Sequence, residues 1–290
     1  MNPRLGAELE ARFGAKLRSV ERVSGGDINE AYSAELEGGR RVFVKTHPSA
    51  PASLFPAEAR GLDWLRNRSG LRVPEVLAVS EAGSELGYLA LEWLESASPA
   101  RDFDERLGQG LAELHRAGAP GFGLDHDNFI GSLPQANGAR ESWVSFFREQ
   151  RLEPQLARLV AARRASFSLR RGFERLFARL PELWGEPEPE PAARLHGDLW
   201  GGNLHVGSSG EPCLIDPAVY GGHREIDLGM MRLFGGFAER VFQAYDEAFP
   251  LTSGAAERVA LCQLYPLLVH ANLFGGSYVG SVERIVAQYS

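Results

Sequence analysis

The sequence predicts an α+β protein with two lobes, and two observations support this fold class. Strand patterns and one amphipathic helix fill residues 17–94, which predicts an N-terminal lobe with a five-stranded antiparallel sheet plus a helix. Helical patterns dominate from residue 97 onward, which predicts a larger, mostly helical C-terminal lobe. We therefore place residues 1–96 in one domain and residues 97–290 in the other. A chain of 290 residues is long enough to bury a substantial core.

Composition narrows the classes of function. A formal net charge of −7 argues against a nucleic-acid surface, which needs a basic face. The longest apolar runs are too short to span a bilayer, so we expect no membrane partner. Cys213 and Cys262 form neither a disulfide framework nor a metal-binding spacing, and the N-terminus lacks a signal segment. These features predict a cytoplasmic protein.

The first elements alternate between strand and turn. Residues 1–15 have the spacing of a short amphipathic helix, and residues 17–23, 30–36 and 41–46 read as strands. The connection Ser24–Asn29 contains the adjacent glycines Gly25 and Gly26, followed by Asp27, Ile28 and Asn29. Glycines let backbone N–H groups approach phosphate oxygens without obstruction, so this segment is a candidate nucleotide-binding loop. Taken alone, it reads as an ordinary hairpin turn; with Lys45 one strand later, it becomes the expected lid over a nucleotide.

Lysine is rare in this chain, which makes Lys45 informative. Of 31 basic residues, only Lys16 and Lys45 are lysines. An ammonium group is a compact point charge, unlike the wide guanidinium fork, and suits a phosphate clamp in a narrow cleft. In the predicted helix 54–66, Glu58 shares the apolar stripe, where a carboxylate is costly unless it is paired. We expect Glu58 to pair with Lys45 and position phosphates; the alternative is a surface glutamate.

Two further strands, 73–79 and 88–94, complete the predicted sheet. Glu92, Trp93 and Leu94 lie where the chain leaves it, and we expect their backbone to face the adenine of a nucleotide.

The remaining elements are mostly helical. We expect helices over residues 103–116, 141–162 and 166–180, then through about residue 249, and from 253 to the end. The residues 118–140 are rich in loops, and 185–191 form an extended acidic linker. The cluster Asp125–Asn128 reads as turn chemistry or a substrate contact rather than a metal site, and His115 as a packed or capping residue. The aromatic residues Trp143, Phe146 and Phe147 are expected in the core.

A catalytic pattern follows the linker. Asp198, Asn203 and then Asp216, after an apolar strand, have the layout of phosphoryl-transfer sites in kinase-like enzymes. We expect Asp198 to act as the base, and Asn203 and Asp216 to bind Mg²⁺, which takes oxygen ligands. The alternative is a purely structural role, with Asp198 as a helix cap and Asn203 in a turn.

The neighbours of this pattern have expected roles too. Trp200 could stack on the substrate, alongside Asp198, or lie in the core. Arg224, Glu225 and Asp227 are expected to hold the metal-binding loop and the backbone of the active site.

Along almost its whole length, the sequence resembles the fructosamine kinase (ketosamine-3-kinase) family. The catalytic motif is shared with aminoglycoside and choline kinases, whereas the segments at 127–135 and 143–152 are more specific. The matching segments are Ser24–Asn29, Val44–Lys45, Glu58–Leu62, Leu111–His115, Asp127–Gln135, Trp143–Leu152, His196–Asn203, Ile215–Gly221, His223–Leu228 and Asn272–Gly276.

The resemblance implies a protein-kinase-like fold and ATP-dependent phosphorylation of the 3-hydroxyl of a ketosamine. It also implies Mg²⁺ as cofactor and deglycation as the physiological role. The substrate could be a small-molecule ketosamine or a glycated lysine on a protein, with ribulosamine or fructosamine as the sugar part. Two alternatives stay open: a kinase for aminoglycosides or choline, and a catalytically inactive kinase fold that serves as a binding module.

Overall fold

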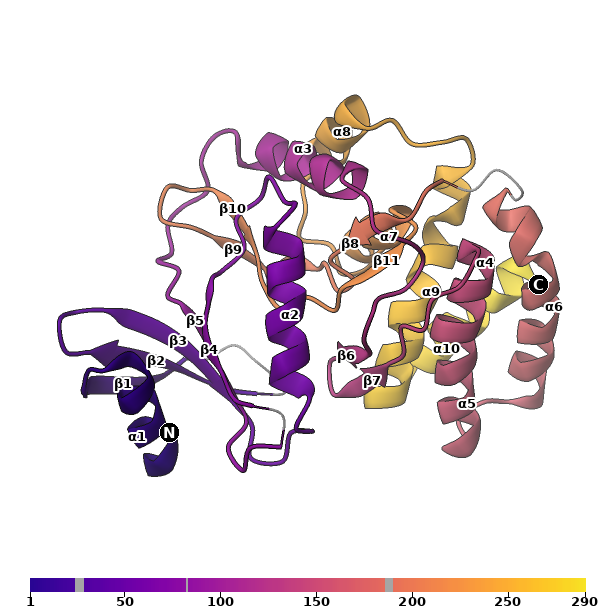
Figure 1. The fold of residues 1–290 in the computed structure, drawn as a ribbon. Helices are drawn as coiled ribbons and strands as arrows, with labels where there is room; N and C mark the ends of the chain where they lie inside the picture. Colours follow the sequence, from indigo (N-terminus) through magenta and orange to yellow (C-terminus); the bar gives the residue numbers. More distant parts are fainter. Residues whose placement is uncertain (24–28, 82, 186–189) are drawn as a thin grey trace.

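The computed structural model describes residues 1–23, 29–81, 83–185 and 190–290 (Figure 1). Five residues of the predicted nucleotide-binding loop, 24–28, fall outside the described residues. Within the described residues, no helix is both long and apolar enough to cross a membrane.

The predicted five-stranded sheet is present in the N-terminal part of the chain. Its strands run antiparallel in the order β1-β2-β3-β5-β4. Helix α1 and the longer α2 accompany the sheet (Figure 1). The bounds are α1 Pro3–Phe13, β1 Leu17–Val23, β2 Glu30–Leu36, β3 Arg41–Thr46, α2 Leu54–Arg66, β4 Val76–Val79 and β5 Tyr88–Glu92.

The two faces of this sheet bury different partners, because side chains alternate along a strand. In β5, Tyr88 and Ala90 join a core with Leu5 and Leu9 of α1. The intervening Leu89 belongs to a second core with α2. The sheet therefore lies between the two helices, and α2 fills the space towards the rest of the chain (Figure 1).

Two predicted strands are shorter than expected. Strand β4 begins at Val76 instead of Val73, and Pro74 in the missing part has no N–H to donate to a strand ladder. Strand β5 ends at Glu92 instead of Leu94, because its ladder with β3 ends at the Val42–Glu92 pair.

The rest of the chain is mainly helical, as predicted, with two differences. The helix predicted over 141–162 is divided by a π-helical turn, and the helix predicted to end at Leu180 continues to Trp184. The bounds are α3 Phe103–Arg116, α4 Trp143–Phe146, the π-turn η1 Phe147–Leu152, α5 Glu153–Ala161, α6 Phe167–Trp184, α7 Glu225–Phe234, α8 Glu239–Ala248, α9 Ala255–Phe274 and α10 Ser277–Tyr289.

Three two-stranded ladders lie between these helices, and of their strands only the apolar strand before Asp216, β10 Pro212–Leu214, was predicted. Each strand has only three residues, too few to show a period of two. They are β6 Asn128–Ile130 with β7 Leu133–Gln135, β8 Ala193–Leu195 with β11 Tyr220–Gly222, and β9 Leu204–Val206 with β10 Pro212–Leu214. A 3₁₀ turn, η2 Gly201–Asn203, lies between β8 and β9. These ladders shape the loops that carry the predicted site.

The cores connect the two parts of the molecule. Trp143, Phe146 and Phe147 are buried in the core of the helical part, as predicted. The cluster that contains Leu62 of α2 also contains Leu111 of α3 and Val219. Helix α2 is therefore packed against the segment that follows Asp216.

Candidate active site

Lys45 lies at the centre of a buried group of charges. Its side chain is 7% exposed, and its Nζ lies 2.7 Å from Glu58 Oε1, so the predicted ion pair is present. Nζ also pairs with Asp216 Oδ1, which joins β3, α2 and the segment after β10 in one contact. Burial alone would lower the pKa of Lys45, but the charges of Asp216 and Glu58 raise it above its usual value. The lysine is therefore held as a cation.

A tight turn carries the chain from β8 to Asp198. Gly197 has a φ of +80°, and a Cβ there would collide with the Ala218 carbonyl oxygen. Only glycine satisfies both constraints, which explains the glycine before the predicted base. The Ala218 N–H donates to the His196 carbonyl at 2.9 Å, so the two loops that bear Asp198 and Asp216 are joined directly.

Asp227, on α7, holds this turn from inside the protein. Its Oδ2 accepts a hydrogen bond from the His196 backbone N–H at 2.7 Å, and its Oδ1 accepts one from Gly197 N–H at 2.9 Å. Burial would raise the pKa of Asp227, but hydrogen bonding to His115 and the nearby histidines keep it below its ordinary value. The structure agrees with the prediction that Asp227 holds the backbone of the site.

Asn203 brings the three predicted residues together. Its Nδ2 donates to the Asp198 carbonyl at 2.8 Å, to Asp198 Oδ2 at 3.1 Å and to the Asp216 carbonyl at 3.3 Å. Since Nδ2 is used within the protein, Oδ1 is the atom that can face a cation. Asp216 has a φ of +55°, a left-handed conformation that aspartate tolerates better than most residues. An amide oxygen and a carboxylate from adjacent loops are a donor set of the kind that Mg²⁺ binds.

The environment of Asp198 favours its protonated form in this structure. Burial raises the pKa of its carboxyl group to about 8, the charges of Asp216 and Asp227 add to this, and the hydrogen bond from Asn203 opposes it. A carboxyl group so placed can exchange a proton near neutral pH.

A cavity of about 430 Å³ opens beside Asp198. Trp200, predicted as a stacking or core residue, lines it and is 40% exposed, so it does not belong to the core. Sequence reasoning did not predict that the other lining residues face this cavity, because they come from three segments that lie far apart in the sequence. They are His47, Ile130, Gly131, Ser132, Val269, His270, Leu273 and Phe274.

Comparison with known proteins assigns the chain to a family. The family model described as "Fructosamine kinase" matches residues 1–290. A Synechocystis protein named "Probable ketoamine kinase" is 40% identical over 97% of this chain and 94% of its own length. The chloroplastic protein-ribulosamine 3-kinase of Arabidopsis thaliana is 35% identical over 94% of this chain and 83% of its own length.

The chain belongs to the fructosamine kinase family.

Solved structures confirm the kinase-like fold. A Thermobifida fusca crystal structure named for fructosamine-3-kinase has a TM-score of 0.89 and 37% identity, covering 99% of this chain and 98% of its own. An aminoglycoside phosphotransferase in complex with ADP and hygromycin B has a TM-score of 0.63 at 19% identity, over 98% of each chain, which shows the shared fold. The chain is thus a phosphotransferase with an alcohol group as acceptor.

The segments that carried the fructosamine kinase resemblance form a buried polar network behind Asp216. Asn128 Nδ2 donates to the Val219 carbonyl at 2.8 Å, and Gln135 Nε2 donates to the Ala218 carbonyl at 3.1 Å. Tyr265 donates in turn to Gln135 Oε1 at 2.7 Å. These side chains fix the backbone that follows Asp216, so Asn128 and Gln135 support the site without lining the cavity.

Arg151 completes this network from the π-turn. Its guanidinium is fully buried and donates to the Ala136 carbonyl and to Asn137 Oδ1, each at 2.6 Å. The ring of Tyr220 lies 3.9 Å from the guanidinium carbon, close enough for a cation–π interaction. In the described part of the chain, Arg151 has no carboxylate partner, so aromatic faces and oxygen acceptors offset its charge.

Several predicted residues lie away from the group formed by Lys45, Asp198, Asn203 and Asp216. Two of the three residues expected to hold the metal-binding loop do not contact it: Arg224 pairs with Glu190 at 2.6 Å, and Glu225 pairs with Arg258 at 2.6 Å. The Glu225–Arg258 pair is buried and the Arg224–Glu190 pair is partly buried, and neither contacts the metal-binding loop, so that prediction was wrong for Arg224 and Glu225. His115 is packed, as expected, against Tyr245.

The cluster from Asp125 to Asn128 has structural roles. Asp125 pairs with His126 at 2.6 Å, and Asp127 Oδ1 accepts the Asn137 N–H at 2.8 Å, as in a turn. In residues 1–23, 29–81, 83–185 and 190–290, no group of three or more His, Cys, Asp or Glu side chains could hold a metal ion.

The exit from the sheet has the predicted position, but its nucleotide contact stays a prediction. The Glu92 N–H donates to the Glu75 carbonyl at 2.9 Å, so it is used within the sheet. The Trp93 ring lies 5.0 Å from the Arg41 guanidinium carbon, and Leu94 is partly exposed. Asn29 is partly exposed beside the start of β2.

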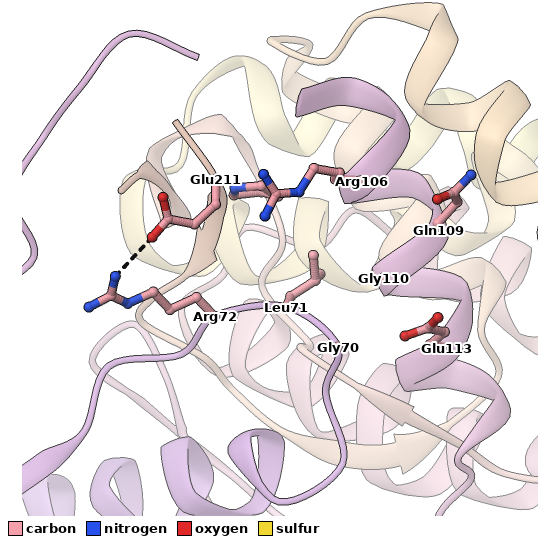
Figure 2. A pocket seen from close by; sticks show the side chains of 9 residues that line it. Gly70, Leu71, Arg72, Arg106, Gln109, Gly110, Glu113 and Glu211 are labelled. Carbon is pink, nitrogen blue, oxygen red and sulfur yellow. Dashed lines mark hydrogen bonds and ion pairs between the residues drawn. The ribbon is translucent and has the colours of Figure 1, made fainter. Parts of the chain in front are cut away.

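A second cavity, of about 440 Å³, lies outside the catalytic group (Figure 2). Arg72 crosses its edge to pair with Glu211 at 2.8 Å, while Arg106 and Glu113 extend along α3. The Arg72 carbonyl also accepts the Leu214 N–H at 2.8 Å. This region joins the segment after α2 to β10 and has none of the predicted catalytic residues in its lining.

Proposed function

We propose that this chain transfers the γ-phosphoryl group of ATP to the 3-hydroxyl of a ketosamine. The observation that carries the proposal is the position of Asp198, which lies at the edge of the open cavity and contacts the Asn203–Asp216 group. Acceptor and phosphate donor would thus meet on either side of one carboxylate. The names of the Synechocystis and Arabidopsis relatives support a ketosamine as the acceptor.

Each residue has a role that its contacts support. Lys45, held by Glu58, would bind phosphate oxygens, with Gly25, Gly26, Asp27, Ile28 and Asn29 as the loop over the phosphates. The backbone of Glu92, Trp93 and Leu94 would face adenine. Residues 1–96 would accordingly form the nucleotide-binding lobe and residues 97–290 the catalytic and substrate-binding lobe.

The reaction follows from Asp198 and its neighbours. The Asp198 carboxylate accepts the proton of the 3-hydroxyl while that oxygen forms a bond to the γ-phosphorus and the bond to the β–γ bridging oxygen breaks, releasing ADP. Asn203 Oδ1 and the Asp216 carboxylate are the groups that would hold Mg²⁺. When bound, Mg²⁺ neutralises phosphate charge and favours the ionised form of Asp198.

The structure supports the two alternatives, an aminoglycoside kinase and an inactive binding module, less well than a ketosamine kinase. An aminoglycoside carries several positive charges, yet Asp198 is the only carboxylate that lines the cavity among the described residues. An inactive binding module would be expected to lack Lys45, Asp198, Asn203 or Asp216, and all four are present and in contact.

We further propose that the amine belongs to a lysine of a polypeptide rather than to a free amino acid. The cavity lining contains no arginine or lysine to pair with a free α-carboxylate. Phe274 is 62% exposed and Phe234 40% exposed, next to Trp200, so the cavity has an apolar aromatic rim on which lysine methylene groups could pack.

The free, buried cysteines are compatible with a cytoplasmic location, which stays a prediction.

The test is Mg²⁺-dependent ADP release with ribulosyl- and fructosyl-lysine, free and in a peptide, and with kanamycin and choline. We expect turnover on ketosamines only, higher on the peptide, with NMR placing the phosphate on the 3-oxygen. Asp198→Asn should lower kcat by roughly 10³-fold and leave nucleotide affinity nearly unchanged. The exposed Asp246→Asn serves as the control. Turnover on kanamycin or choline alone would contradict the proposal, and normal turnover by Asp198→Asn would remove that residue as the base.

A further inference from the structure

Two histidines from opposite parts of the chain line the cavity beside Asp198. His47 follows β3, and His270 lies near the end of α9. Neither belongs to the phosphoryl-transfer group, and each has one ring nitrogen engaged by the backbone of its own segment. The engaged nitrogen determines which chemistry the other nitrogen can offer to a ligand.

His270 offers an acceptor. Its Nδ1 lies 2.8 Å from the Pro266 carbonyl oxygen, and because a carbonyl can only accept, Nδ1 carries the proton. Burial lowers the pKa of His270, so the ring is neutral and its Nε2 has a free lone pair. The rings of Phe234, Phe274 and Tyr278 pack around the imidazole, with centroids at 4.8, 5.6 and 5.1 Å.

The end of α9 is fixed, so the His270 ring has a defined place. Asn272 Nδ2 donates to the carbonyl and to Oε1 of Gln155, and Arg164 donates to the Ala271 carbonyl at 3.0 Å. The wall of the cavity that bears His270 is therefore tied to α5 and to the loop after it.

His47 offers a donor. The backbone N–H of Ser49 donates to His47 Nδ1 at 3.0 Å, so Nδ1 is unprotonated and the proton of the ring lies on Nε2. The cavity therefore has a donor on the wall near β3 and an acceptor on the wall of α9.

We propose that His270 Nε2 accepts a hydrogen bond from a sugar hydroxyl other than the 3-hydroxyl, and that His47 Nε2–H donates to a different sugar oxygen. Together the two histidines orient the sugar so that its 3-hydroxyl faces Asp198. A ligand with several hydroxyl groups on adjacent carbons satisfies both, whereas a simple alcohol leaves a buried polar atom without a partner. This inference rests on the proposed function and adds the residues that determine sugar specificity.

The test combines variants with substrate analogues. His270→Phe keeps the aromatic packing and removes the acceptor, and Tyr278→Phe is the matched control, because Tyr278 packs on the same imidazole without lining the cavity. Each is assayed for ADP release with a fructosyl-lysine peptide and with its 4-deoxy, 5-deoxy and 6-deoxy analogues. His47→Phe is assayed in the same way.

We expect His270→Phe to lower kcat/KM for the complete substrate by roughly 10- to 100-fold. For one deoxy analogue, the same substitution should have almost no effect, since the partner hydroxyl is already missing. His47→Phe should show the same behaviour with a different analogue. Tyr278→Phe should leave kcat/KM unchanged, and the KM for ATP and the melting temperature should stay close to those of the parent.

The outcomes separate the two claims. If the parent phosphorylates the ketosamine but His270→Phe costs the same factor on every analogue, the role of His270 is refuted and the proposed function stands. If the parent phosphorylates no ketosamine, both are refuted.

Discussion

Asp227 supports the catalytic turn through two backbone hydrogen bonds, and Asp227→Asn tests how much of the site depends on them. Both carboxylate oxygens accept a backbone N–H inside the protein, where Asp227 is fully buried. An asparagine has the same shape but only one acceptor oxygen. If that oxygen keeps the bonds to His196 and His115, the amide NH₂ faces the Gly197 N–H, which then has no acceptor.

The expected loss of stability and of activity in Asp227→Asn follows from this geometry. A hydrogen bond to a charged group contributes about 1.5–3 kcal/mol, so we expect a loss of about 2 kcal/mol in the free energy of unfolding. For a chain of 290 residues, that corresponds to a fall in Tm of roughly 3–4 °C. Gly197 precedes Asp198, and a shift of the turn displaces the carboxylate, so kcat should fall roughly 10- to 100-fold.

The pH dependence supplies a second measurement. Since the pKa of Asp227 is lowered in the folded state, its stabilisation is present above the ordinary pKa of about 4 and is lost as the pH falls. The difference in Tm between the parent and Asp227→Asn should therefore be largest near pH 7 and become smaller below about pH 4.

The assays are thermal unfolding followed by circular dichroism, and ADP release with a ketosamine. Asp246→Asn is the matched control, because the exposed Asp246 also accepts one backbone N–H, that of Leu251, at 2.7 Å. It should change Tm by no more than about 1 °C. A parent-like Tm and kcat for Asp227→Asn would refute the argument that these bonds support the turn.

Three further substitutions test other contacts. Lys45→Met should lower kcat by roughly 10²-fold and destabilise the protein by about 3 kcal/mol or more, because Glu58 loses its buried counter-charge. Lys16→Met, at an exposed position, is the control, and equal effects of the two substitutions would contradict the role of the Lys45–Glu58 pair. Arg151→Met leaves two oxygen acceptors unpaired and should cost roughly 2–4 kcal/mol in urea unfolding, whereas an unchanged midpoint would show that the network is dispensable. Hydrogen bonds from Ser209 and Arg72 lower the pKa of Glu211 to about 2. Glu211→Gln should therefore reduce Tm at pH 7, and the reduction should become smaller as the pH falls from about 4.5 to 2. A difference in Tm between parent and variant that is the same at every pH would argue against this stabilisation by Glu211.

The sequence by itself determined the N-terminal sheet and the catalytic motif. Strand alternation and a glycine turn are local signals, so β1, β2, β3 and α2 lie at the predicted residues. Glu58 could be paired with Lys45 in advance, because a carboxylate on an apolar face requires a partner. The spacing of Asp198, Asn203 and Asp216 predicted that the three residues lie together, and the structure brings them into contact.

Only the tertiary structure decided what surrounds this motif. The cavity beside Asp198 is assembled from the segment after β3, the β6–β7 hairpin and α9, and no local pattern indicates that His47 and His270 face the same space. Arg224 and Glu225 are charged residues close in sequence to Asp216 and could have contacted the metal-binding loop. Helix packing instead places them in ion pairs with Glu190 and Arg258. Hydrophobic periodicity specifies which face of an element is buried, but the partner buried against that face depends on how distant elements pack. For this reason, the sequence predicted which residues meet around Asp198, whereas packing determined the shape of the cavity beside it.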